Sequence, residues 1–165
     1  MSRLIFLLFF VVVIMGGIAF AQGTSVEPSK EQIFWEQIDI TSEWGKWFKS
    51  TIKPYFEKMS EVATTYIFPA IEIDITGLSP DEIMKKVNAG YVDYYKAIQS
   101  IIPSLELKAY HSKIVELFAE TTKTGPMRNE ELINKLGAEA NQELVQVFTQ
   151  HGVPQKIIDE FTKNL

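Results

Sequence analysis

The chain has 165 residues, of which 46% are apolar, with 16 basic and 21 acidic side chains and no cysteine. This length predicts one domain. The composition excludes a disulfide-rich scaffold, a protein that crosses a membrane many times and a strongly basic nucleic-acid-binding protein. The apolar residues are unevenly spread, because residues 4–21 contain no charged side chain. Without residues 1–21, the other 144 residues carry a net charge of −6.

The first twenty-one residues have the pattern of a secretory signal peptide. Arg3 precedes twelve consecutive apolar residues, and Ala19 and Ala21 stand at the alternate positions of an A-x-A cleavage site. This pattern predicts cleavage after Ala21 and export to a secreted, periplasmic or cell-envelope location. The alternative is a membrane anchor through residues 4–21, since eighteen uncharged residues lie near the lower limit for a spanning helix.

The rest of the chain reads as a short lead-in followed by one folded region. Residues 22–28 are predicted to be a flexible lead-in, and residues 29–165 a single helical domain. Ser29 and Gln32 fit a capping box, in which each residue satisfies a backbone N–H of the first helical turn. We therefore expect a short helix that begins at Ser29 and ends near Ile40.

A long apolar stripe predicts a helix over residues 42–67. Its members follow one another at steps of three or four: Trp44, Phe48, Ile52, Tyr55, Met59, Val62 and Tyr66. Pro54 lies inside this pattern, where it removes one backbone hydrogen bond and clashes with the preceding turn. We expect a kink or a restart of the helix near Ile52. Phe68 and Pro69 are predicted to end it.

Residues 71–75 alternate isoleucine with acidic residues, which is the period of a β-strand. A single five-residue strand without a partner does not form a sheet. We therefore predict an extended connection, with its isoleucines packed against the helices and its end at Thr76 and Gly77.

Three more long or medium helices and a short final one follow. Ser79 and Pro80 begin a helix over 79–102, which ends before Pro103. A helix over 104–122 would place these residues inward: Leu107, Tyr110, Ile114, Leu117 and Phe118. Asn129 begins a helix over 129–150 that His151 and Gly152 end, and the last helix carries Ile157, Ile158 and Phe161. The predicted fold is all-α, a bundle of five to six helices after the signal peptide.

Few catalytic chemistries fit the sequence. The two histidines, His111 and His151, fall inside one predicted helix and at the end of another. Neither is accompanied by a G-x-S-x-G nucleophile motif or by the H-E-x-x-H metal motif. We predict no metal, no cofactor and no nucleic-acid partner.

Two pairs of carboxylate side chains are candidate sites. Glu72 and Asp74 share one face of an extended segment, and Glu116 and Glu120 lie one helical turn apart. Such pairs can serve acid–base catalysis or bind calcium, but acids that face solvent are the simpler interpretation. A hydrolase that uses Glu72, Asp74 and His111 is the third functional hypothesis.

Aromatic residues are the one enriched feature. The candidate ligand or partner contacts are Trp44, Trp47, Phe48, Tyr91, Tyr94 and Tyr110. At helical spacing such residues usually form core, although a ring left exposed can contact a partner, an apolar ligand or a membrane surface.

The sequence predicts an exported, non-enzymatic helical protein, a binding or protein-interaction module with an unknown protein partner. The alternative is a carrier of a small apolar ligand in a cavity between helices, with tyrosine hydroxyls as polar tips. A membrane is expected as a partner only if the signal segment is not cleaved.

Overall fold

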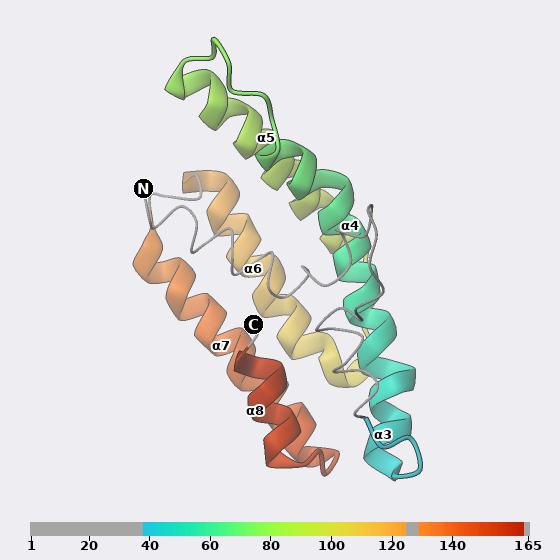
Figure 1. Ribbon diagram of the computed structural model, residues 1–165. Helices are drawn as coiled ribbons and strands as arrows, with labels where there is room; N and C mark the ends of the chain where they lie inside the picture. The colour runs from blue at the N-terminus through green and yellow to red at the C-terminus, as the bar shows by residue number, and fades with distance from the viewer. Residues whose placement is uncertain (1–37, 125–128, 164–165) are drawn as a thin grey trace, which may run out of the picture. The chain divides into compact units, whose positions relative to one another are not determined.

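The computed structural model describes residues 38–124 and 129–163, and all regular structure in these ranges is helical (Figure 1). The predicted all-α class is therefore confirmed for this part of the chain, which contains no β-strand. The signal peptide, the lead-in at 22–28 and most of the helix predicted from Ser29 lie outside the described residues. Within the described ranges, none of the helices has the length and apolar character needed to cross a membrane.

The chain divides into two compact units. The first combines Met1–Ser60 with Val145–Leu165, and the second is Glu61–Leu144. The boundaries fall inside two helices, α4 (Lys53–Ile71) and α7 (Glu130–Gln150). Each unit is described separately below.

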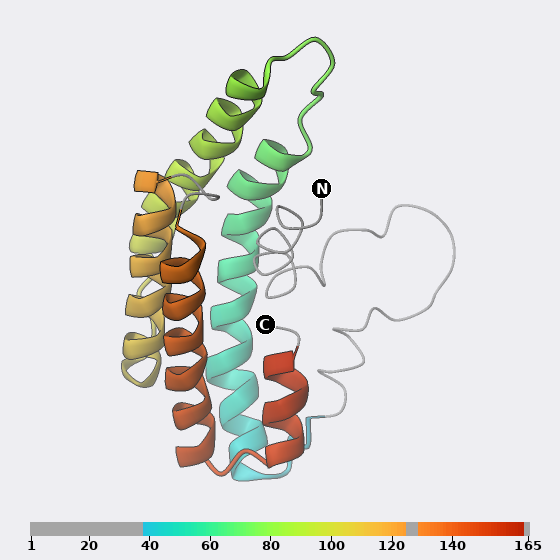
Figure 2. The ribbon, with the colours of Figure 1, turned by 90° about the vertical axis from the view of Figure 1, so that its left-hand side faces the viewer.

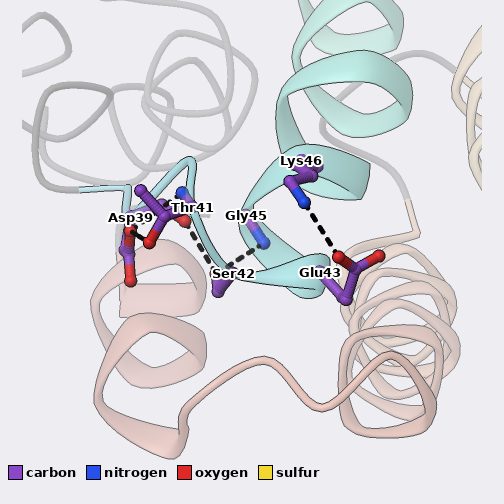
Figure 3. A network of polar contacts seen from close by, with 6 residues as sticks. All are labelled: Asp39, Thr41, Ser42, Glu43, Gly45 and Lys46. Atoms are coloured by element: carbon purple, nitrogen blue, oxygen red, sulfur yellow. Dashed lines mark hydrogen bonds and ion pairs between the residues drawn. The ribbon is translucent and has the colours of Figure 1, made fainter.

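The first unit begins with a capped helix, α3 (Glu43–Trp47). Figure 3 shows the side-chain oxygen of Ser42 accepting a hydrogen bond from the backbone N–H of Gly45 at 3.1 Å. The carboxylate of Asp39 accepts bonds from the backbone N–H and the hydroxyl of Thr41. These bonds satisfy donors that a helix start leaves without partners. Residues 38–40 precede the cap and are not helical, so the predicted first helix does not reach Ile40.

A π-helical turn, η1 (Phe48–Ile52), connects α3 to α4. The backbone N–H of Lys53 bonds to the carbonyl of Phe48, five residues earlier. This wider turn accommodates Pro54, which has no N–H to donate to the carbonyl four residues earlier. The predicted restart near Ile52 is confirmed, since α4 begins at Lys53.

The first unit is completed by the end of α7 and by α8 (Gln155–Lys163). Gly152 has φ +70° and reverses the chain after α7, as the sequence predicted. Ile157 and Ile158 are buried, and Phe161 contacts three other aromatic rings.

The second unit contains α5 (Pro80–Gln99), the 3₁₀ turn η2 (Leu105–Leu107), α6 (Lys108–Thr124) and most of α7. Ser79 and Glu82 form the complete capping box of α5. The residues predicted to face inward from α6 are all buried: Leu107, Tyr110, Ile114, Leu117 and Phe118. α4 and α5 approach closely at Gly90, where an added Cβ would lie 2.7 Å from the carbonyl oxygen of Tyr66.

Two predicted helix ends and one predicted packing contact in this unit are corrected. α4 continues through Pro69 to Ile71, because the fixed φ of proline, about −65°, is also a helical value, and the helix ends two residues later. α5 ends at Gln99 rather than at residue 102. The connection between α4 and α5 runs beyond the ends of both helices (Figure 2), and Ile75 is 59% exposed instead of packed against them.

Candidate functional site

Phe48 lies at the centre of an aromatic cluster in the first unit. Its side chain has no exposed surface. Its ring centroid lies 5.0 Å from that of Phe148 and 5.6 Å from that of Phe161. Offset and edge-on arrangements at these distances are favourable for aromatic pairs. Phe48 therefore contributes to the core of its unit, and its ring is not available to a partner at the surface.

The two candidate tryptophans are partly exposed. Trp44 packs edge-on against Phe48, with 6.5 Å between ring centroids. Trp47 stacks on the imidazole of His151, with 3.7 Å between centroids and 4° between planes. The stack covers one face of each ring, so Trp47 and His151 are linked to each other at the edge of the aromatic cluster.

The three candidate tyrosines are buried in the second unit. Tyr91 and Tyr94 come from α5 and Tyr110 from α6, and each side chain is at most 1% exposed. The ring of Phe118 lies 6.2 Å from that of Tyr91 and 4.6 Å from that of Tyr94. These four rings join α5 to α6.

Burial raises the pKa of all three hydroxyls. The pKa of Tyr91 rises to about 12 because its phenolate would lose solvation. Burial also raises the pKa values of Tyr94 and Tyr110, and the neighbouring Tyr110 and Tyr91 phenols add to the shift of Tyr94. The hydroxyls thus lie near one another and stay protonated at physiological pH. They can act as hydrogen-bonding groups but not as bases.

Asn88 carries a buried polar atom without a partner. Its Oδ1 has no hydrogen bond among the described residues. Asn88 lies three residues before Tyr91 on α5, which places both on neighbouring positions of one helix face. A buried acceptor that is not satisfied costs free energy, so such an atom requires an explanation.

The hydrolase constellation is not assembled. His111 is 8% exposed, and its ring donates a hydrogen bond to the backbone carbonyl of Ile98, near the C-terminal end of α5. Glu72 and Asp74 lie in the connection before the N-terminal end of α5. Ile98 lies eighteen positions after Pro80, which corresponds to roughly 27 Å of helix, so the length of α5 separates the imidazole from both carboxylates.

The acidic pairs have local partners or face solvent. The hydroxyl of Thr76 lowers the pKa of the Asp74 carboxyl group by hydrogen bonding, and the backbone N–H of Thr76, at 2.9 Å, lowers it further. Glu116 pairs with Lys113, and Glu120 pairs with Lys123. Among the residues that the structure describes, no group of three or more His, Cys, Asp or Glu could hold a metal ion.

Two aliphatic side chains that the sequence did not single out are the most exposed large apolar groups described. They lie in the apolar loop, residues 101–105, between α5 and α6. Ile102 is 92% exposed and Leu105 is 79% exposed. The signal that could have found them is Pro103, which places Ile102 after the end of a helix, together with the absence of charge over positions 97–105.

No family model, curated protein or solved structure matches the chain. The functional interpretation therefore rests on the geometry of the chain itself.

Proposed function

We propose that the protein is an exported, non-enzymatic interaction module whose contact surface includes the apolar loop. The observation that carries this proposal is the exposure of Ile102 and Leu105 beside a well-packed aromatic core. Large aliphatic side chains that face water gain free energy when a partner covers them. Adjacent exposed apolar residues are a feature of contact surfaces.

The other candidate contact residues are less available to a partner than the apolar loop. Phe48, Tyr91, Tyr94 and Tyr110 are enclosed by their own units. Trp44 and Trp47 keep some exposure, but their rings already pack on Phe48 and His151. The loop, in contrast, presents its two side chains to solvent.

A photoreactive amino acid at position 102 tests the proposal in the cell that makes the protein. Its matched control is the same group at position 89, since Ala89 is exposed in the middle of α5, away from the loop. We expect a defined adduct from position 102, identified by mass spectrometry, and none from position 89. Equal adduct patterns from both positions would contradict the proposal.

The second candidate function is a carrier of a small apolar ligand that also has a hydrogen-bond donor. The unpartnered Oδ1 of Asn88 favours it, because a donor on a bound ligand would satisfy this buried acceptor. The nearby Tyr91, Tyr94 and Tyr110 would supply further polar contacts in an apolar surrounding.

Native mass spectrometry of the protein from its own host tests the carrier. A retained small molecule, lost in Asn88→Leu, would support it, whereas the mass of the bare chain would argue against it. The same spectrum tests the signal peptide, since export with cleavage after Ala21 predicts a chain that begins at Gln22.

A further inference from the structure

We propose that the apolar loop inserts into the surface of a lipid bilayer. This inference rests on the proposed function and names the partner of the same surface. Its basis is the combination of two exposed aliphatic side chains and an uncharged stretch of chain.

The size of the exposed apolar surface favours lipid over protein. A standard protein interface takes about 800 Å² and 20–30 residues from each partner. The apolar loop offers two side chains, while Ser104 within it and the neighbouring Ser100 and Glu106 are exposed and polar. A second copy of the chain or a folded partner would need a larger complementary surface, whereas a bilayer has no such requirement.

The charges around the loop permit insertion. No charged residue occurs over positions 97–105, so placing Ile102 and Leu105 among acyl chains would bury no ionised group. Lys96 and Lys108 flank the stretch, but Asp93 pairs with Lys96 at 3.2 Å and Glu106 precedes Lys108. Because these charges offset one another, we expect neutral lipid to be sufficient.

At the start of the loop and at Pro103, the backbone presents no free N–H group, which would be costly in an apolar surrounding. The N–H groups of Ser100 and Ile101 already bond to the carbonyls of Ala97 and Ile98, each at 3.1 Å. Pro103 has no N–H. Fewer donors therefore lose water when the tip of the loop enters the headgroup region.

Two aliphatic side chains give weak, reversible binding. Burial of each raises a partition coefficient by at least about tenfold. The pair thus approaches a single acyl anchor, which by itself binds marginally, and stable anchoring takes a second signal.

The absence of cysteine makes a direct test possible. A polarity-sensitive fluorophore is attached to Leu105→Cys in the full chain. The labelled protein is then mixed with phosphatidylcholine vesicles that carry a quencher on the acyl chains. The matched control carries the fluorophore at Ala89→Cys. We expect a blue shift and quenching at position 105 and neither at position 89. Emission at position 105 that vesicles leave unchanged would overturn the inference.

A second substitution tests whether the loop itself inserts. Ile102→Ser in the labelled chain should lower the inserted fraction of the probe at least tenfold. The control is Ile75→Ser, which removes an exposed isoleucine from the connection between α4 and α5. It should leave the inserted fraction unchanged. Equal losses would overturn the inference, and circular dichroism of both variants checks that the helices remain.

The adduct experiment at position 102 and the fluorescence experiment at position 105 together distinguish this inference from the proposed function. A protein adduct from position 102 together with an unquenched probe at position 105 would overturn lipid insertion and leave an interaction module. An unquenched probe without any adduct from position 102 would contradict both.

Discussion

His111 is a buried titratable side chain whose protonation changes with folding. Burial lowers the pKa of its imidazole below the usual 6.5, and the hydrogen bond to the carbonyl of Ile98 opposes part of that shift. The neutral ring is therefore favoured in the folded state. Between the lowered pKa and the unfolded value near 6.5, the unfolded chain binds more protons, so stability rises with pH across this window.

This linkage predicts that stability decreases as the pH falls below about 6.5. The decrease ends once the pH is below the folded-state pKa of His111, because both states are then protonated. The urea midpoint at pH 5.5 should be lower than at pH 7.5. In His111→Gln, which does not titrate, the difference between the two midpoints should be smaller. An equal difference in both proteins would assign the pH dependence to other groups.

At the residue scale, the sequence identified the aromatic candidates but not which of their side chains would be enclosed and which would be exposed. Trp44, Trp47 and Phe48 are close in sequence, yet only Phe48 is fully enclosed, since Phe148 of α7 and Phe161 of α8 both contact its ring. No local pattern reports which distant segments will cover a side chain. The exposed Ile102 was missed for the converse reason, because α5 ends three residues before it.

The helices α4 and α5 depend on a glycine where they approach each other. A Cβ at Gly90 would collide with the Cβ of Ala70 and lie 2.7 Å from the carbonyl oxygen of Tyr66. A backbone atom cannot be displaced without moving α4. The absence of a side chain at position 90 therefore sets the separation of the two helices.

Gly90→Ala should lower the free energy of unfolding by about 1–3 kcal/mol, the usual cost of overpacking. This is opposite in sign to helix propensity, which favours Ala over Gly by about 1 kcal/mol. Urea unfolding measures the change. The double variant with Ala70→Gly should recover part of the loss, because one of the two clashing groups is removed. A more stable Gly90→Ala protein would contradict the close approach.

The last helix, α8, is attached to the first unit through an aromatic contact. The ring centroid of Phe161 lies between 5.1 and 5.6 Å from those of Phe48, Phe56 and Phe148. Ile157 and Ile158 add two buried aliphatic groups.

Phe161→Ala should therefore destabilise the protein by about 2–4 kcal/mol, slightly less than a fully buried phenylalanine because its ring keeps some exposure. The exposed Lys156→Ala on the same helix is the control and should change stability by less than about 0.5 kcal/mol. Similar values for the two variants in urea unfolding would show that α8 is not docked through this ring.

Elements were predicted well where local chemistry determines them. Ser79 with Pro80 defined the start of α5, Gly152 the end of α7, and Pro54 the break that became a π-helical turn. The prediction was wrong for a connection whose side chains can either pack against the helices or face solvent. The isoleucines at 71–75 alternate like those of a half-buried strand, but Ile75 lies in a connection that extends past both helices and is exposed.

For the whole molecule, the main feature is a cysteine-free chain whose described part is stabilised by helix packing. Its buried groups are overwhelmingly apolar or aromatic. Ion pairs such as the one between Lys113 and Glu139 lie at partly exposed side chains and contribute little in water. Stability is therefore assigned to the core residues, and the apolar loop is the proposed contact surface.

Urea unfolding of Ile102→Ser/Leu105→Ser tests this assignment most directly. If both side chains face solvent and serve contact, the double variant should unfold within about 0.5 kcal/mol of the original protein. A loss of more than about 3 kcal/mol, as for buried aliphatic side chains, would show that the loop belongs to the core, and would contradict its role as the contact surface.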